Sequence, residues 1–141
     1  MHTLVFKIPP VPASRPRVTQ YGAYYNKEYD QFRKDMAKLL MGKVTLYAEP
    51  LRLDVTFFKE IPKSYSKKLR DEMDGTYISI KPDLDNYEKA IYDSLNECVW
   101  KDDSQIVEHS TRKVWVKSEP RIVVIIERLN DREKYNNTHG L

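Results

Sequence analysis

The residues best suited to metal chemistry lie in residues 81–86, which read KPDLDN. Asp83 and Asp85 are two positions apart, and side chains at that spacing project to the same side of an extended chain. Two carboxylates about 4 Å apart repel by roughly 4 kcal/mol at an effective dielectric near 20. Such a pair persists when both face water, when one is protonated, or when a cation lies between them. Magnesium suits the third case, because it binds a few carboxylate oxygens, keeps several waters and leaves positions for phosphate.

Helix capping is the ordinary structural explanation for one of these aspartates. Asp85 precedes a predicted helix and is followed three residues later by Glu88, a spacing that resembles a capping box. Both aspartates also lie near the positive end of the predicted helix dipole. Capping explains Asp85 as well as a metal does, but a cap does not require Asp83.

A second acidic pair, Asp102 and Asp103, follows the helix predicted over residues 86–99. That helix is roughly 20 Å long at 1.5 Å per residue, so the two acidic pairs lie at its opposite ends unless the chain folds back. A shared metal requires the strand from Ile106 onward to run beside the segment that leads into Asp83, which brings Asp103 alongside. A solvated turn is the alternative explanation for this second pair.

Lys89 lies one helical turn beyond Asp85 on the polar face, and Asp93 lies one turn further. The structural explanation is a set of surface ion pairs worth a few tenths of a kcal/mol each. The functional explanation is a cation beside the metal carboxylates, placed to hold a substrate phosphate or to offset charge during attack. The spacing alone does not decide between the two.

Other metal and phosphate sites do not fit the spacing. A calcium-binding EF-hand loop that began at Asp83 would need glycine and glutamate where Glu88 and Ser94 stand. The three histidines are scattered, and Cys98 is the single cysteine, which excludes a multi-cysteine zinc site and an intramolecular disulfide. The four glycines form no phosphate-binding loop.

The elements around these residues predict an α+β fold, with helices packed on a mixed β-sheet in a single domain of residues 1–129. Alternating hydrophobic residues predict strands, and helical spacing with Asn26 as a cap predicts a helix. The run from Ile122 to Ile126 is typical of an interior strand covered on both faces. The predicted strands are 3–8, 51–58, 77–81, 106–117 and 121–128, and the predicted helices are 27–41, 86–99 and a short one within a basic insertion at about 59–75.

Two segments are predicted to lack regular structure. Residues 9–18 contain four prolines and form an extended loop, and residues 130–141 are polar and form a flexible C-terminal tail. The chain has 141 residues and a formal net charge of +3, from 24 Lys and Arg against 21 Asp and Glu. No apolar run approaches the length of a membrane helix. We therefore expect a reduced, cytoplasmic protein without a membrane segment.

The order and spacing of these motifs resemble the RusA family of Holliday-junction resolvases. The similarity runs from Lys81 to about Arg112 and includes KPDLDN at 81–86, Lys89, DSLN at 93–96 and VWKDDSQI at 99–106, with a weaker echo in residues 9–17. The resemblance implies a magnesium-dependent endonuclease that cuts four-way DNA junctions as a homodimer. It implies that the ligands of Mg²⁺ are Asp83, Asp85 and Asp103, and that Lys89 is the essential basic residue beside them.

The resemblance also suggests how the remaining residues act. Asp93 is expected to make a structural contact or to orient Lys89, and Trp100 to pack over the end of the helix, with stacking on DNA as the weaker alternative. Basic residues of the proline-rich loop and the insertion are expected to contact DNA phosphates around the acidic centre. They are Arg15, Arg17, Lys63, Lys67, Lys68 and Arg70. A solvated loop is the alternative explanation for the lysines.

Two other functions are alternatives to a junction-cutting nuclease. One is a branched-DNA-binding protein that does not cleave, although binding alone gains nothing from acidic groups that face phosphate. The other is a different magnesium enzyme with an Asp-x-Asp pair, such as a nucleotide-sugar transferase. The short chain and the lack of a nucleotide-binding pattern argue against the latter.

Overall fold

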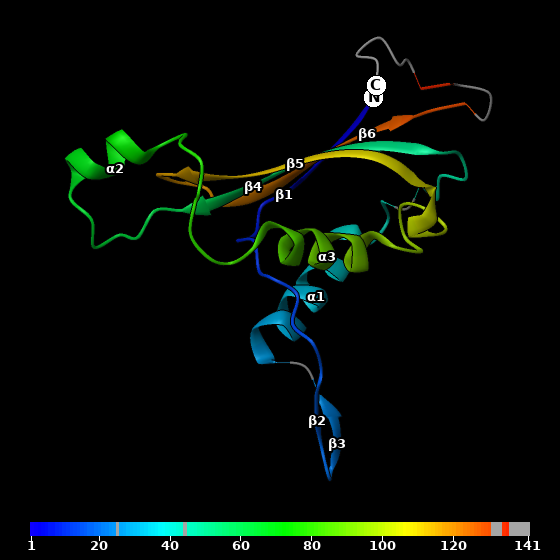
Figure 1. Ribbon diagram of the computed structural model, residues 1–141, viewed down its shortest axis with the longest axis horizontal. Helices are drawn as coiled ribbons and strands as arrows, with labels where there is room; N and C mark the ends of the chain where they lie inside the picture. The colour runs from blue at the N-terminus through cyan, green and yellow to red at the C-terminus, as the bar shows by residue number, and fades with distance from the viewer. Residues whose placement is uncertain (25, 44, 131–133, 136–141) are drawn as a thin grey trace.

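Two helices pack against one face of a four-stranded sheet, as Figure 1 shows for the computed structural model. The structure describes residues 1–141 except 25, 44, 131–133 and 136–141. A short helix extends from one end of the sheet, and a two-stranded hairpin points away from it. In chain order the elements are β1 His2–Phe6, β2 Arg17–Thr19, β3 Gly22–Tyr24, α1 Lys27–Leu40, β4 Leu51–Glu60, α2 Lys67–Met73, α3 Leu84–Leu95, a 3-10 turn Asp103–Gln105, β5 Ile106–Val116 and β6 Arg121–Arg128.

The sheet is mixed, with the strand order β1-β6-β4-β5. β6 lies between β1 and β4 and is antiparallel to both, whereas β4 and β5 are parallel. Parallel neighbours need a crossover connection, and the chain passes through α2 and α3 between these two strands. The predicted α+β fold, with helices on a mixed sheet, is confirmed.

The hydrophobic core lies between the sheet and the helices α1 and α3. Alternate residues of β4, such as Leu53 and Val55, are fully buried there. The predicted interior position of β6 is correct, but within one chain only one of its faces is covered. Val124 is buried, whereas Val123 and Ile125 are only half-buried, because α1 and α3 both lie on the opposite face of the sheet (Figure 1).

Side-chain caps begin both α1 and α2, and Asn26 is the cap that the sequence predicts for α1. Asn26 caps α1, and its side chain accepts a hydrogen bond from the backbone N–H of Tyr29 at 2.8 Å. Ser66 caps α2 within the basic insertion and accepts from the N–H of Leu69 at 3.2 Å. These contacts satisfy backbone donors that have no partner within the first turn of a helix.

The helix predicted over 86–99 is α3, which begins two residues earlier and ends at Leu95. It ends early because Glu97 adopts a positive φ of 66° and donates its N–H to the carbonyl of Trp100 at 2.8 Å. Val99 therefore lies in the turn that follows α3 and is buried in the core.

The strand predicted over 77–81 does not form. Only Tyr77 forms a bridge, to Val114 of β5, and the next contact is the hydrogen bond from Ile78 N–H to the carbonyl of Lys113 at 3.0 Å. Ile78 packs in a small separate core with Ile61, which explains its apolar character without a strand.

The sequence did not predict the β2–β3 hairpin, because the prolines before it indicate an extended loop. Of the predicted C-terminal tail, residues 131–133 and 136–141 lie outside the described part of the chain. Among the helices that the structure describes, none has the length and apolar character needed to span a bilayer.

Candidate active site

Asp83 and Asp85 lie at the N-terminus of α3, but not on one stretch of extended backbone. Asp83 is the N-cap residue, with φ −67° and ψ 147°, whereas Asp85 already belongs to the first helical turn. The Asp83 side chain caps no backbone group, and its Oδ1 lies 3.3 Å from Nζ of Lys81. Glu88 does not complete a capping box, because it accepts a hydrogen bond from Thr111 at 2.6 Å. Both aspartates are exposed, at the positive end of the helix dipole.

The proline-rich loop packs beside this end of α3. The backbone N–H of Ala13 donates to the carbonyl of Asn86 in the first turn of α3 at 2.9 Å. A hollow of about 290 Å³ lies nearby and is lined by Ser14, Arg15, Arg17 and Asn26. The hydroxyl oxygen of Ser14 is buried and has no hydrogen-bond partner in the described part of the chain. An exposed pair of guanidinium groups with a free hydroxyl suits a phosphate group.

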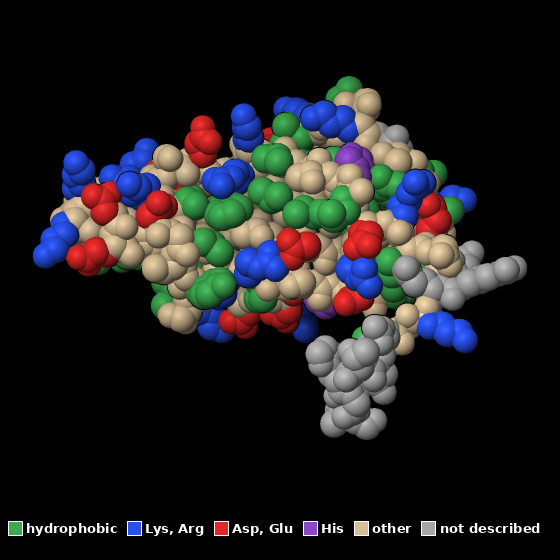
Figure 2. Space-filling model, turned by 90° about the horizontal axis from the view of Figure 1, so that it is seen from above, with side chains coloured by type: hydrophobic (Ala, Val, Ile, Leu, Met, Phe, Trp, Pro, Cys, Tyr) green, Lys and Arg blue, Asp and Glu red, His purple; other side chains and the backbone are tan. Residues whose placement is uncertain are grey.

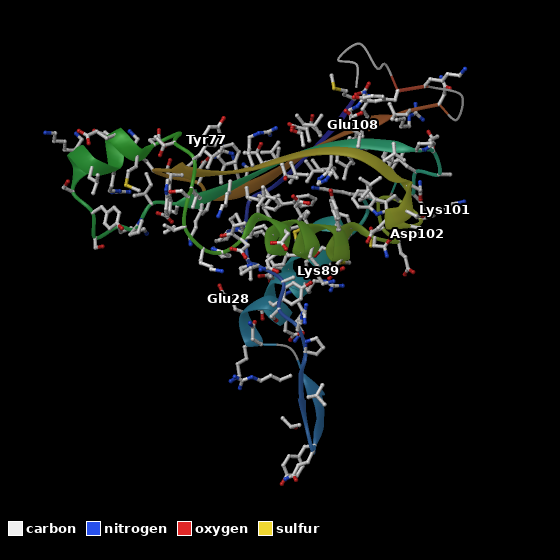
Figure 3. All side chains as sticks on the ribbon, in the orientation of Figure 1. Glu28, Tyr77, Lys89, Lys101, Asp102 and Glu108 are labelled. Atoms are coloured by element: carbon white, nitrogen blue, oxygen red, sulfur yellow. The ribbon has the colours of Figure 1, made fainter. Side chains whose placement is uncertain are left out.

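Lys89 lies near the middle of α3 and is held by an acidic neighbour (Figure 3). Its Nζ lies 3.1 Å from Oδ2 of Asp93, one turn further along the helix. The same Oδ2 accepts a hydrogen bond from the hydroxyl of Tyr29 on α1 at 3.0 Å. Burial raises the pKa of Tyr29, which keeps this hydroxyl protonated as a donor. Asp93 thus makes a structural contact to α1 and also positions Lys89.

Asp103 follows α3 and is anchored by a buried tryptophan. Nε1 of Trp100 donates to Oδ1 of Asp103 at 2.6 Å, and Trp100 is fully buried against the core. The burial of Trp100 confirms its packing role and excludes stacking on DNA in this conformation. Burial raises the pKa of Asp103, and the charges of Asp93 and Asp102 raise it further, against the opposing effects of Trp100 and Lys89.

Asp102 has a local structural role. It caps the 3-10 turn, in which its backbone N–H donates to Oε1 of Gln105 at 2.9 Å and its Oδ2 accepts from Ser104 at 2.6 Å. Figure 3 shows Asp102 at the end of the sheet beyond the C-terminus of α3. The two aspartates therefore have different surroundings. Asp102 stabilises the turn, and Asp103 lies near the charges of Asp93 and Lys89.

The structure brings together only part of the predicted set. Asp103 lies close enough to Lys89 and Asp93 for their charges to act on it. Asp83 is ten positions before Asp93, a distance of about 15 Å along the helix axis at the ordinary rise. Asp83 and Asp93 therefore lie at opposite ends of α3.

The chain does return past the segment that leads into Asp83, but at the wrong end of β5 for a shared site. Nζ of Lys113 donates to the carbonyls of Ile80 and Pro82, both at 2.7 Å. Lys113 is ten positions after Asp103 in the sequence, and those residues are nearly all extended along β5. The segment 80–82 thus lies near the C-terminal half of the strand, far from Asp103.

The donor chemistry of each acidic group fits magnesium, although no single group contains all the predicted ligands. Within the described ranges, no cluster of three or more His, Cys, Asp or Glu side chains is placed to hold a metal ion. Magnesium commonly uses one or two carboxylates and completes its shell with waters and substrate phosphate. Asp83 and Asp85 at one end of α3, or Asp103 at the other, satisfy that requirement for oxygen ligands.

Sequence patterns did not reveal a polar network between α3 and β5. Glu88 accepts from Thr111 and lies 3.4 Å from Nδ1 of His109, and its side chain is only 17% exposed. Tyr92 stacks edge-on against His109, and its buried hydroxyl has no partner in the described chain. Only the long-range pairing of α3 with β5 shows that these residues meet, so no local signal could have found them.

The basic insertion forms α2 and its flanking loops, at the opposite end of the sheet from Asp103. Two of its predicted DNA contacts have partners in the protein: Nη2 of Arg70 donates to the carbonyl of Lys117 at 3.1 Å, and Lys63 lies 4.0 Å from Glu60. Lys67 and Lys68 are exposed. Figure 2 shows acidic side chains interspersed with the basic ones here, so the surface is not uniformly positive.

A family model described as Endodeoxyribonuclease RusA matches residues 7–127. The chain belongs to the RusA family. The matched region contains every residue that the sequence patterns single out, from Arg15 and Arg17 to Asp103.

A relative of the chain occurs in Bacillus subtilis (strain 168). The uncharacterized protein YqaN is 36% identical to the chain over 90 residues, which make up 61% of this chain and 63% of YqaN. The match thus spans just under two thirds of that relative's length.

Proposed function

We propose that this RusA-family protein is a magnesium-dependent endodeoxyribonuclease that resolves four-way DNA junctions by paired symmetric nicks. The observation that carries this proposal is the family match over residues 7–127, together with the presence of Asp83, Asp85, Lys89 and Asp103 within it. The chemistry is hydrolysis of a phosphodiester by water, which requires no covalent protein nucleophile.

The three aspartates would hold the metal. When bound, magnesium would supply an activated water and would stabilise negative charge on the phosphoryl oxygens. The side chain of Lys89 is 61% exposed and can therefore reach a DNA phosphate while Asp93 fixes its position. Its charge would stabilise the pentacovalent phosphate during attack.

A site that contains all three aspartates would draw on a second copy of the chain. Two oxygens bound to one magnesium ion lie within about 4 Å of each other, because each lies about 2.1 Å from the ion. Asp83, the N-cap of α3, lies about 15 Å along the helix axis from Asp93, whose charge acts on Asp103. We therefore propose that Asp103 of one protomer joins Asp83 and Asp85 of its partner.

The uncovered face of the sheet is an apolar surface on the opposite side of the sheet from α3 (Figure 1), so the contact that would join Asp103 of one protomer to Asp83 of its partner lies elsewhere. Figure 2 shows hydrophobic side chains gathered along the middle of this face. Val5 is 48% exposed there, and Val123 and Ile125 of β6 are half-buried. The charged groups beside them are paired: Arg52 contacts Glu108 at 2.7 Å and Glu127 at 2.9 Å. An apolar face whose neighbouring charges form ion pairs is typical of a protein interface.

A two-fold dimer matches the substrate as well. A four-way junction has two equivalent strands to cut, and a two-fold axis presents two identical sites to them. Arg15 and Arg17, next to the acidic end of α3, would bind the phosphates on either side of the cut. The exposed Lys67 and Lys68 of α2 would extend this contact along a DNA arm.

The test compares a synthetic four-way junction with a linear duplex and a flap, each with and without magnesium. We expect paired symmetric nicks on the junction, only with the metal. Asp85→Asn should abolish nicking and leave junction binding intact or tighter, because it removes a negative charge close to phosphate. Cleavage of linear duplex at the same rate as the junction would reject the proposed selectivity, and binding without any nicking would favour the non-cleaving alternative.

A further inference from the structure

The β2–β3 hairpin presents an aromatic side chain that the fold does not use. Its two-residue loop, Gln20 and Tyr21, is closed by the pairing of Thr19 with Gly22, and Gly22 has a φ of +121°. Thr19 fixes the turn, because its hydroxyl oxygen lies 3.2 Å from both the N–H of Tyr21 and the carbonyl of Gly22. The Tyr21 side chain at the tip is 90% exposed.

Among the described residues, no sheet or helix covers the tip of the hairpin, where Tyr21 is exposed. β2 and β3 form a sheet of their own, and Figure 1 shows them pointing away from the main sheet. Val18 is 82% exposed on the same hairpin. A lone two-stranded hairpin is marginally stable in water, and neither side chain adds burial that would stabilise it. The apolar tip therefore suits contact with another molecule better than folding.

The chemistry of the hairpin changes from its base to its tip. Arg15, Arg17 and the unpartnered Ser14 hydroxyl line the hollow at the base. Arginines bind phosphate, and an exposed aromatic ring stacks on bases. A cationic base with an aromatic tip is thus complementary to a nucleic-acid strand, whose phosphates lie outside and whose bases lie inside.

The dimensions fit this assignment. Three residues of strand extend about 10 Å at 3.3 Å per residue, so the tip reaches about 10 Å beyond the arginines. The major groove of DNA is about 8.5 Å deep. With the arginines on phosphates, the Tyr21 ring therefore reaches the level of the base pairs. The loop also lies beside the acidic end of α3, through the hydrogen bond from Ala13 to Asn86.

We propose that Tyr21 stacks on a base at the branch point of the junction and makes the protein select branched over linear DNA. This inference rests on the proposed function. Separating stacked bases within a continuous duplex costs a few kcal/mol, whereas pairs at a branch point already lack one stacking neighbour. Stacking of Tyr21 therefore costs less free energy on a junction than on a continuous duplex, so it strengthens binding to junctions and not to duplex DNA.

The experiment measures binding without magnesium to a four-way junction and to a linear duplex of equal length. The junction carries 2-aminopurine at the branch point, and its fluorescence reports loss of stacking. We expect Tyr21→Ala to weaken junction binding about 5- to 150-fold, the equivalent of ~1–3 kcal/mol, and to leave duplex binding unchanged. Tyr21→Phe should bind as the wild type does, because stacking does not require the hydroxyl.

Tyr77→Ala is the matched control, because Tyr77 is 75% exposed and lies near α2, away from the hairpin (Figure 3). The inference is overturned if Tyr21→Ala binds the junction as Tyr77→Ala does, or if it weakens junction and duplex binding equally. It is also overturned if the wild type leaves the 2-aminopurine signal unchanged. A wild-type protein that nicks junctions while Tyr21→Ala matches it rejects the hairpin role alone. A wild type that neither binds nor nicks junctions rejects the proposed function and this role together.

Discussion

A heterodimer of two inactive variants tests whether each metal site draws residues from both protomers. The variants are Asp83→Asn and Asp103→Asn, one in each chain. If Asp103 of one protomer joins Asp83 and Asp85 of the other, one site of the heterodimer carries both substitutions and the second site carries neither. If every site uses a single chain, both sites of the heterodimer are defective.

The structure sets the size of the expected signal. Within one chain, Asp83 lies about 15 Å along the helix axis from Asp93, the residue whose charge acts on Asp103, whereas shared ligation of one magnesium ion requires roughly 4 Å between ligand oxygens. The shared arrangement leaves one intact site of two, so the heterodimer should nick at about half the wild-type rate. Resolution by paired nicks should remain absent, because the second strand has no functional site.

The assay uses co-expressed chains that carry different affinity tags, so that sequential purification isolates the heterodimer. Nicked and fully resolved junction products are separated on denaturing and native gels. The two variant homodimers are the controls, and both should be inactive. A heterodimer as inactive as the homodimers, with junction binding retained, would refute the shared site. Variant homodimers that resolve junctions at the wild-type rate would show that neither aspartate is needed.

Three further predictions follow from the geometry of α3 and the proline-rich loop. Lys89→Ala should slow nicking about 10²- to 10³-fold, the usual effect of losing one charge that stabilises a transition state, while circular dichroism remains unchanged; a near-normal rate would make Lys89 a surface ion pair. Asp103→Asn should raise the Tm of the metal-free protein at pH 7. Burial raises the pKa of Asp103 in the folded state, so the stability that its protonated form provides is lost as the pH rises through that pKa. The neutral Asn side chain does not lose a proton and avoids this loss. The difference in Tm between the variant and the wild type should vanish below about pH 3.9, the ordinary pKa of Asp. A difference in Tm that does not change with pH would contradict the prediction. Replacing Arg15 and Arg17 with Ala should reduce the salt dependence of junction binding by about one phosphate contact each, and an unchanged slope would exclude these residues from the DNA interface.

Local signals were sufficient for most of the secondary structure. Alternation along 51–58 located β4, and the side chains of Asn26 and Ser66 cap α1 and α2. These signals work because the relevant contacts lie within a few residues of each other. The end of α3 was not predictable in this way, because the positive φ of Glu97 depends on how Trp100 packs into the core.

Long-range pairing accounts for what the sequence did not reveal. The apolar residues of 77–81 suggested a strand, but Ile78 packs with Ile61 while Ile80 is 60% exposed. The network of Glu88, Thr111 and His109 depends equally on the placement of α3 against β5. The hydrophobic pattern of a segment indicates which of its residues are buried. It does not indicate which distant segment packs against them.

The separation of the two acidic groups follows from the connectivity of the fold. Ten residues, 96–105, join the end of α3 to the start of β5, and Asp103 within them lies close enough to Asp93 for that charge to act on it. Because α3 then runs back along β5, with Glu88 opposite Thr111, its N-terminus lies toward the far end of the strand. This antiparallel placement of α3 along β5 keeps Asp83 away from Asp103 within one chain. If one metal needs both residues, the fold itself makes catalysis depend on association of two copies.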